Sequence, residues 1–171
     1  MRLSLFLLFS VLLTGCLGTP KGVIPIENFE ANRYLGKWYE IARLDHSFER
    51  GLSKVSAEYS LQKDGGIQVL NQGFSKKDNE WNKAEGKAYF INGDKQGHLK
   101  VSFFGPFYSS YIIFELDKTN YDYAFISGYT NSYLWLLART PNIDHAIIDR
   151  FISLSKKLGF NTDTLIFVNQ E

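Results

Sequence analysis

The sequence predicts an all-β protein: an eight-stranded antiparallel up-and-down β-barrel, with one C-terminal α-helix packed outside it and a short ninth strand. Three observations carry this prediction. Segments of alternating polar and apolar residues follow one another from Gly36 to Arg139, and hairpin-type turns separate them. Eight short strands linked in this way bury their edges by closing into a barrel. One later stretch has helical periodicity instead.

The strands are set by alternation and by the turns between them. An approach element at 29–35, with room for one helical turn, precedes Gly36, which allows a tight entry into the first strand. The Asp-Gly-Gly sequence at 64–66 is typical of a hairpin turn, because these residues tolerate positive φ. The predicted strands are 37–44, 53–62, 67–75, 80–91, 98–104, 111–116, 123–128 and 133–138.

The last three of these strands are apolar on both faces, so their outer side must be covered. The predicted helix supplies the cover through an apolar stripe at 3.6-residue spacing, formed by Ile143, Ile147, Phe151, Leu154 and Leu158. Asn142 or Asp144 caps its start, and Gly159 suits its end. Residues 165–168 are predicted to form the ninth strand. Any outer apolar surface left uncovered would be a homodimer face.

Trp38 is predicted to plug one end of the barrel, and Arg139 to return and cover it. Hairpins alternate between the two ends, so the start of strand one, the turn at 117–122 and Arg139 share an end. The loops at 45–52, 76–79, 105–110 and 129–131 form the other end, the mouth. A guanidinium stacked on an indole contributes about 0.5–2 kcal/mol. Gly36, Trp38 and Arg139 are therefore interpreted as structural closure residues, not ligand residues.

Residues 1–15 have the features of an export signal. Arg2 supplies the positive charge, and the apolar run at 3–13 is about half of the ~20 residues that a spanning helix needs. The run ends in Leu13-Thr14-Gly15-Cys16, which resembles the bacterial lipobox. Cys16 is the single cysteine of the chain, so it has no internal disulfide partner. The alternative is an ordinary signal peptide with a stray cysteine.

The lipobox resemblance implies cleavage before Cys16, a thioether-linked diacylglycerol, and an amino-terminal acyl chain such as palmitate; more than one chain is needed for stable anchoring. Leu17 after the cysteine, rather than an aspartate, favours the outer membrane of a Gram-negative bacterium, with the domain facing the periplasm. The predicted divisions are a lipoprotein signal peptide (1–15), an acylated N-terminus and tether (16–28), and the barrel domain (29–171).

The charge balance argues against nucleic-acid binding. The chain has 19 Lys and Arg against 18 Asp and Glu, and loss of Arg2 with the signal peptide makes these numbers equal. Its 171 residues suit one domain with an ample core.

An eight-stranded barrel is either filled by side chains or holds one small ligand. Small inward residues on the second and third strands favour a cavity, and its apolar wall suits a hydrocarbon ligand. Which alternate residues of strands four, six and seven point inward stays open, because a single bulge exchanges the inward and outward faces of a strand. Alternation assigns the ligand-binding wall to Val55, Ala57, Tyr59, Val69, Asn71, Leu99, Val101, Phe103, Tyr111, Ile113, Tyr133 and Trp135.

The mouth carries two further groups of residues. Arg43, Arg50 and Lys54 flank the first loop and are candidates for pairing with a phosphate or carboxylate head group. The alternative is that they are solvated charges balanced by nearby acidic residues. An aromatic loop at the same rim either dips into a lipid interface or folds in as a lid. Its members are Phe104, Phe107 and Tyr108.

With these residues in view, the chain resembles a lipocalin from about residue 28 to residue 168. The family motif G-x-W stands as Gly36-Lys37-Trp38, and the arginine that ends strand eight stands as Arg139. The T-D-Y motif is imperfect, with Asp117 its clear match. Residues 36–50, 86–90 and 100–108, together with the lipobox, are similar to the bacterial outer-membrane lipoprotein lipocalins. The resemblance implies that Tyr59 and Trp135 lie on the pocket wall.

The predicted function is therefore membrane-anchored binding, storage or transport of a fatty acid or lysophospholipid, with a role in envelope maintenance implied by the family. Two alternatives stay open: an enzyme acting on a lipid in the same cavity, and a filled barrel that serves as an interaction protein. No catalytic residue, metal or cofactor is predicted, because His46, His98 and His145 lack metal spacing and are expected to be solvated. Glu40 can point inward with a raised pKa, and as a lone carboxyl it is interpreted as a structural hydrogen-bond partner.

Overall fold

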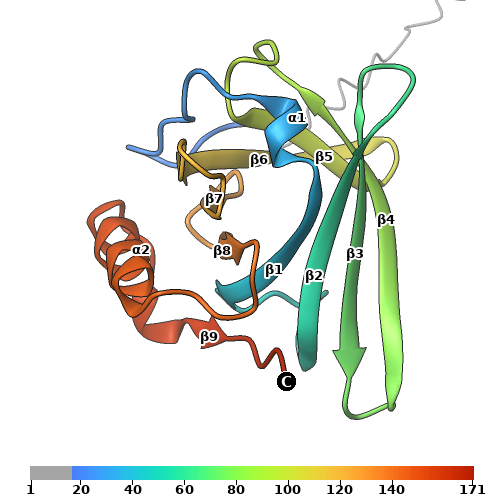
Figure 1. The fold of residues 1–171 in the computed structure, drawn as a ribbon, viewed down its shortest axis with the longest axis vertical. Coiled ribbons are helices and arrows are strands. Elements are labelled where there is room, and N and C mark those ends of the chain that lie inside the picture. The colour runs from blue at the N-terminus through green and yellow to red at the C-terminus, as the bar shows by residue number, and fades with distance from the viewer. Residues whose placement is uncertain (1–16) are drawn as a thin grey trace, which may run out of the picture.

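The computed structural model describes residues 17–171, and its β-sheet curls into a barrel with one helix outside (Figure 1). The predictions for residues 1–16, the signal peptide and Cys16 among them, lie outside the described residues. The strands are β1 (Gly36–Arg43), β2 (Leu52–Leu61), β3 (Ile67–Ser75), β4 (Glu80–Phe90), β5 (His98–Phe104), β6 (Phe107–Leu116), β7 (Tyr123–Ser127), β8 (Leu134–Ala138) and β9 (Ile166–Phe167). The helices are α1 (Ala31–Tyr34), α2 (His145–Lys157) and the 3₁₀ turn η1 (Thr162–Thr164).

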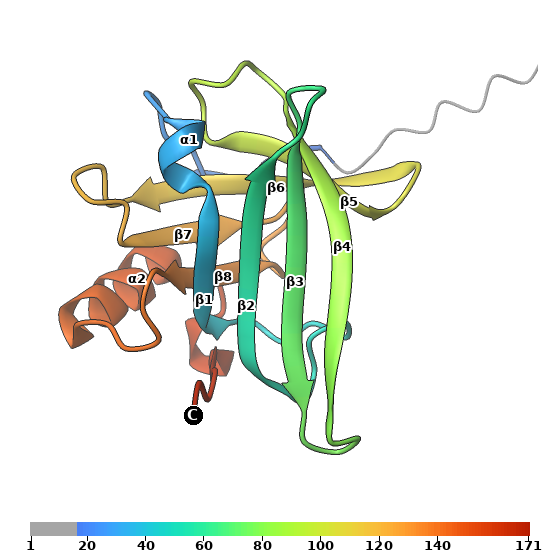
Figure 2. The ribbon, with the colours of Figure 1, turned by 45° about the vertical axis from the view of Figure 1, so that its right-hand side comes forward.

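The strand order confirms the predicted barrel. Consecutive strands pair from β2 to β8, β8 pairs with β1, and β1 pairs with β2 to close the ring (Figures 1 and 2). All these pairs are antiparallel, and β9 adds to the end of β1 at residues Ala42 and Arg43. Within the described residues, no helix is long and apolar enough to cross a membrane.

The predicted boundaries differ most at β6, which begins at Phe107 rather than at 111. The reason is a tight hairpin: Phe104 pairs with Phe107, so β6 starts directly after Gly105 and Pro106 instead of after a loop. The ninth strand is shorter than predicted, because only Ile166 and Phe167 pair with β1.

The barrel wall separates two apolar cores. The inner core contains Trp38, Tyr59 and Ile126, whereas the outer core lies between β6–β8 and α2 and contains Phe125 and Phe151. This arrangement confirms that the helix covers the doubly apolar strands.

The helix ends are formed as the sequence predicts. Asp144, not Asn142, is the N-cap, since its carboxylate accepts a hydrogen bond of 2.9 Å from the backbone N–H of Ala146. Gly159 follows the C-cap with φ of +84°, a conformation that favours glycine.

A β-bulge in β1 changes which side chains face the cavity. The register with β8 shifts between Glu40 and Ala42. Before the shift, Trp38 belongs to the inner core, whereas Ile41 and Ala42 after it belong to the outer core. Strict alternation therefore fails in the second half of β1.

Much of the segment predicted to be a tether is packed against the barrel. The N–H of Ile26 donates to the carbonyl of Ile113, and the N–H of Gly97 donates to the carbonyl of Ile26, both at 2.9 Å. Val23 is 4% exposed and belongs to the outer core. The free part of the segment is thus shorter than the predicted range of 16–28.

Candidate ligand-binding site

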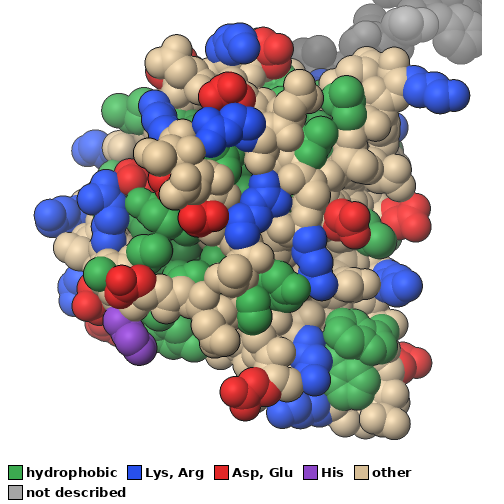
Figure 3. All heavy atoms as spheres, in the orientation of Figure 1, with side chains coloured by type: hydrophobic (Ala, Val, Ile, Leu, Met, Phe, Trp, Pro, Cys, Tyr) green, Lys and Arg blue, Asp and Glu red, His purple; other side chains and the backbone are tan. Residues whose placement is uncertain are grey.

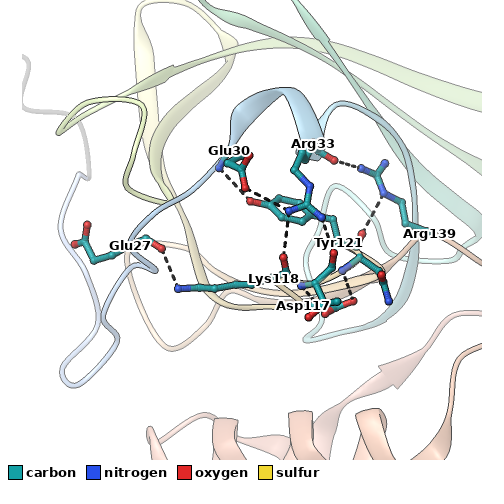
Figure 4. Close-up of polar contacts among 9 residues, drawn as sticks. Glu27, Glu30, Arg33, Asp117, Lys118, Tyr121 and Arg139 are labelled. Atoms are coloured by element: carbon teal, nitrogen blue, oxygen red, sulfur yellow. Dashed lines mark hydrogen bonds and ion pairs between the residues drawn. The ribbon is translucent and has the colours of Figure 1, made fainter.

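Trp38 and Arg139 close one end of the barrel, as the sequence predicts. The guanidinium carbon of Arg139 lies 4.0 Å from the indole centroid of Trp38, which is fully buried. The same guanidinium donates hydrogen bonds to the carbonyls of Tyr121 and Arg33 at 3.3 and 2.7 Å (Figure 4). It also donates to the carbonyl of Lys37 at 2.9 Å. Arg139 therefore ties β8 to the start of β1, to α1 and to the β6–β7 turn.

The β6–β7 turn lies at this closed end, as the hairpin count predicts. Asp117 organises the turn by accepting hydrogen bonds from the backbone N–H groups of Thr119 and Asn120 (Figure 4). Arg33 of α1 crosses to it, stacking 4.2 Å from the ring centroid of Tyr121 and donating to the carbonyl of Lys118. The closed end is thus held by contacts between segments far apart in the sequence.

Three tyrosines form the polar part of the cavity floor above Trp38. The hydroxyl of Tyr111 shares hydrogen bonds with those of Tyr34 and Tyr59, at 2.7 and 2.9 Å. Burial is the main cause that raises the pKa of all three phenols, so they are neutral. Tyr34 was not predicted here, since it stands in the approach element before the first strand.

Above this floor the barrel encloses a cavity of about 570 Å³, within the range of small-molecule sites. The barrel is therefore not filled. The predicted inward residues that line it are Val55, Ala57, Tyr59, Val69, Asn71, Leu99, Val101, Phe103, Tyr111, Tyr133 and Trp135. Their inward orientation is confirmed; that they bind a ligand stays a prediction.

Ile113 is the predicted wall residue that does not line the cavity. Its side chain is inward but fully buried in the inner core. The backbone at Ile113 is flanked by Ile26 and Gly97, so the docked N-terminal segment reinforces the barrel at this level. Ile113 therefore packs the floor instead of the wall.

A buried charged cluster lies beside the cavity, between β1 and the β1–β2 loop. Arg43, 1% exposed, donates to the carboxylate of Glu40 at 2.7 Å and to the carbonyl of Glu49 at 2.8 Å. The prediction that Arg43 is a head-group ligand at the mouth is wrong, because both of its terminal nitrogens are occupied and it does not line the cavity. The β1 bulge is the physical reason.

Both carboxyl groups of this cluster line the cavity. Burial, and then the charge of Glu49, raises the pKa of Glu40, which Arg43 partly offsets. Burial likewise raises the pKa of Glu49, although the indole N–H of Trp135 donates to it at 3.0 Å. The inward position and raised pKa predicted for Glu40 are confirmed, but Glu40 is one of a pair and not a lone group.

The prediction that His46 and His98 are solvated is wrong, because both side chains are buried. His46 is 5% exposed and stacks against Phe48, Tyr133 and Trp135, with ring centroids 4.7–5.3 Å apart. Burial, and then the nearby positive charge of Arg43, lowers its pKa to about 4. His98 is buried beside the hydroxyl of Ser110. His145 is exposed, as expected.

Comparison with known proteins assigns the chain to a family. The profile of the lipocalin-like domain matches residues 29–170. The chain belongs to the lipocalin-like family. It is 61% identical to the outer membrane lipoprotein Blc of Vibrio cholerae serotype O1 over 171 residues, which covers 100% of both chains. It is 47% identical to the protein of that name from Escherichia coli K12 over 151 residues, 88% of this chain and 85% of that one.

More distant lipocalins share the fold. Apolipoprotein D of Macaca fascicularis is 31% identical over 151 residues, which covers 85% of this chain and 79% of that one. The structure of insecticyanin from Manduca sexta superposes with a TM-score of 0.71 at 20% identity, and the match covers 89% of this chain and 86% of that one. Family and cavity together identify a lipocalin that binds a hydrophobic ligand, of the bacterial outer-membrane lipoprotein group that the sequence indicates.

The other two predicted head-group residues lie off the cavity wall. Arg50 is exposed and donates to the carboxylate of Asp45 at 2.5 Å, which matches the alternative of a balanced surface charge. Lys54 is half-buried on β2. Lys83 of β4 is the one cation among the described residues at the cavity wall. Its side chain shares the outer face of the sheet with Tyr39, because the cross-strand pairs run from Lys83 through Gln72 and Ser56 to Tyr39, which packs in the outer core.

The rim of the mouth is aromatic and exposed. Phe104 is 82% exposed, Phe107 66% and Phe48 62%, and all three also line the cavity opening. A second group lies near the tip of the β3–β4 hairpin, where hydrophobic side chains gather on the surface (Figure 3). There Phe74 and Trp81 pack with ring centroids 5.6 Å apart. The aromatic loop is therefore open, not folded in as a lid.

Across the described residues, no three His, Cys, Asp or Glu side chains come together in a way that would hold a metal ion. The site that the structure builds is thus an apolar cavity with a neutral tyrosine floor, one acidic pair near the opening and an aromatic rim.

Proposed function

We propose that this lipocalin is a membrane-anchored carrier that binds one fatty acid or lysophospholipid, with the acyl chain in the barrel and the polar end at the mouth. The observation that carries the proposal is the cavity of about 570 Å³, apolar along its wall and sealed at one end by Trp38 and Arg139. An acyl chain gains free energy by leaving water for such a wall, whereas its head group keeps its hydration at the opening.

The location proposed for the carrier is the outer membrane, facing the periplasm, through acylation of Cys16. The names of the relatives, outer membrane lipoproteins, and the lipobox support this assignment. Storage or transport of envelope lipids follows as the proposed role. Mass spectrometry of the membrane-extracted protein should find an N-terminus at Cys16 with three acyl chains, and an unmodified cysteine would contradict the anchor.

For the head group, we propose Arg50 and Lys54, which flank the β1–β2 loop at the mouth, as the cationic partners of a phosphate or carboxylate. Arg50→Gln should weaken binding of a lysophospholipid or fatty acid by a few-fold, because an exposed ion pair contributes little. Lys87→Gln, on β4 and outside the cavity lining, is the control. Equal affinity in the two variants would reject the role of Arg50.

The deciding experiment is titration of Trp fluorescence with a lysophospholipid and a fatty acid of equal chain length, both below their micelle concentrations. Trp135 lines the cavity and should report occupancy, so saturable one-to-one quenching is expected, and Trp135→Phe should remove most of it. Trp81, half-exposed on the outside, supplies the control variant Trp81→Phe, which should keep the response. No response to either lipid would reject the carrier function.

A second candidate function is an enzyme that acts on the bound lipid. The observation in its favour is the pair of buried carboxyl groups, Glu40 and Glu49, with raised pKa at the cavity wall. The proposed carrier should release each lipid chemically unchanged after prolonged incubation, as mass spectrometry would measure. Turnover that Glu49→Gln abolishes would favour the enzyme.

A homodimer stays a separate proposal. Phe167 of β9, 53% exposed outside the barrel, is the apolar residue on that side that a partner copy would cover. Sedimentation velocity of the wild type and of Phe167→Ser tests it, and a concentration-independent monomer in both would reject it.

A further inference from the structure

The rim and the N-terminal segment together carry an inference about how the barrel sits on a membrane. The tip of the β5–β6 hairpin, from Phe104 to Phe107, contains no charged residue. The hairpin projects away from the neighbouring strands (Figure 2). Its two phenylalanines and Phe48 of the β1–β2 loop are the most exposed aromatic residues of the described chain. Exposed apolar groups around an apolar cavity indicate an interaction surface.

The N-terminal segment is fixed beside this mouth. The N–H of Val23 donates to the carbonyl of Pro20 at 3.1 Å, which closes a turn. At Gly22 of this turn, a Cβ would lie 3.4 Å from Leu158. Asn131 donates to the carbonyl of Leu158 at 2.9 Å and shares a surface hollow with Lys21 and Gly22.

Asn131 belongs to the β7–β8 connection, which is part of the mouth. Gly128 and Tyr133, from the same connection, line the opening of the cavity. The turn at 20–23 therefore lies outside the barrel at the level of the mouth. It does not lie at the end closed by Trp38.

The chain that joins this turn to Cys16 is short. Only Leu17, Gly18 and Thr19 intervene, and an extended chain spans at most about 3.6 Å per residue, so the separation is at most about 15 Å. An acyl anchor on Cys16 thus holds the mouth within a short distance of the membrane surface. A longer flexible tether would leave the orientation of the barrel free.

We propose that the mouth docks on the membrane that holds the anchor, with Phe104 and Phe107 inserted at the lipid interface, so that lipid passes between bilayer and cavity without crossing water. The proposal rests on the acyl anchor of the proposed function. Aromatic side chains suit the interface, where apolar burial and partial hydration coexist.

The charges near the rim favour apolar insertion over electrostatic adsorption. Arg50 is paired with Asp45, and the β3–β4 turn combines Lys76 and Lys77 with Asp78 and Glu80. Because these two groups of charges balance and the tip of the β5–β6 hairpin carries none, docking through that tip should depend weakly on salt and on the content of anionic lipid.

The test places a nitroxide label at the rim or at the opposite end of the barrel. Phe107→Cys labels the mouth, and Leu61→Cys is the matched control, an exposed apolar residue (58%) at the closed end of β2. Cys16 of the full-length protein is consumed by acylation, so the introduced thiol is the free one. The purified lipoproteins are placed in vesicles of phosphatidylethanolamine and phosphatidylglycerol, and collisions with oxygen and with a water-soluble nickel complex are measured.

The expected result is a severalfold higher ratio of oxygen to nickel collisions for the label at position 107 than for the label at 61, unchanged by added salt. Two labels equally open to nickel would overturn the proposal, as would a label at 107 shielded from both reagents, which indicates a protein partner or a second copy. Amide exchange at 103–108, slower in vesicles than in solution, repeats the test without any substitution.

Separate measurements distinguish failure of the proposed function from failure of the docking proposal. Loss of the anchor would show as lipoprotein that does not sediment with the vesicles, and loss of carrier activity as missing quenching of Trp135. A protein that sediments and binds lipid, but whose label at 107 stays in water, contradicts the docking proposal alone.

Discussion

At the closed end of the barrel Arg139 covers a fully buried Trp38 and donates to three carbonyls, whereas at the mouth three phenylalanines lie more than half exposed. Two buried polar atoms that lack partners among the described residues, Nε of Arg43 and Nε2 of His46, also lie near the mouth. The polar and apolar groups at the closed end thus have partners within the protein, whereas some of those at the mouth do not.

This difference indicates how the molecule divides stability and function. Closure is achieved by contacts whose energy does not depend on a ligand. Exposed aromatics and incompletely paired buried groups cost stability, and they persist where binding or conformational change uses them. We therefore expect substitutions at the closed end to change the free energy of unfolding, and substitutions at the rim to change lipid exchange with little change in folding.

The largest expected effect is at the floor. Trp38→Ala should lower the free energy of unfolding by about 3–5 kcal/mol, because it leaves a large cavity and an unpaired carbonyl at Tyr34, which now accepts from the indole at 2.8 Å. Urea denaturation measures the loss. Trp81→Ala, at a half-exposed site near the mouth, should cost far less, and equal losses would break the comparison between the two ends.

The next largest effect on the free energy of unfolding is expected at the buried charged cluster of Arg43, Glu40 and Glu49. Arg43→Met should destabilise the protein by about 3–5 kcal/mol at pH 8, because Glu40 loses the charge that stabilises its carboxylate. A carboxyl whose folded-state pKa is raised contributes stability that is lost as pH rises, so the deficit should shrink towards pH 5. Arg50→Met, which breaks an exposed pair, is the control with little effect. A deficit that does not vary with pH would contradict this account.

His46 sharpens the comparison at low pH. Its pKa of about 4 lies below the unfolded value near 6.5, so its contribution to stability is present above 6.5 and is lost as pH falls towards 4. Between pH 7 and pH 4, the free energy of unfolding of His46→Phe should therefore fall by about 1–3 kcal/mol less than that of the wild type. Thermal or urea unfolding across that range measures it. The exposed His145, replaced by Gln, should leave the wild-type profile unchanged.

The smallest effect on folding is expected at the rim. Phe104→Ser and Phe107→Ser should change the free energy of unfolding by less than about 0.5 kcal/mol, since both side chains are in water. The same variants should slow lipid uptake from vesicles severalfold. Stopped-flow quenching of Trp135 measures the rate, with Leu61→Ser as control. Uptake as fast as in the wild type would contradict a role of the exposed rim in lipid exchange.

Much of the barrel could be predicted from the sequence, because its signals are local. Alternation placed Val55, Tyr59 and Val101 on the cavity wall, and the hairpin rule placed Trp38 and Arg139 at one end. The prediction was wrong at Arg43 because a bulge after Glu40 changes the face of the strand, and nothing in the local pattern marks that bulge.

The sequence by itself determined the strands, the capped helix, the closure pair and most of the inward wall, since periodicity and turn chemistry act over a few residues. Only the tertiary structure decided three features: the burial of His46 under the aromatic mouth, the pairing of Arg43 with Glu40 and Glu49, and the docking of residues 20–28 beside the barrel. Each depends on which distant segments meet, and on whether burial of a charge is offset by a partner from another element.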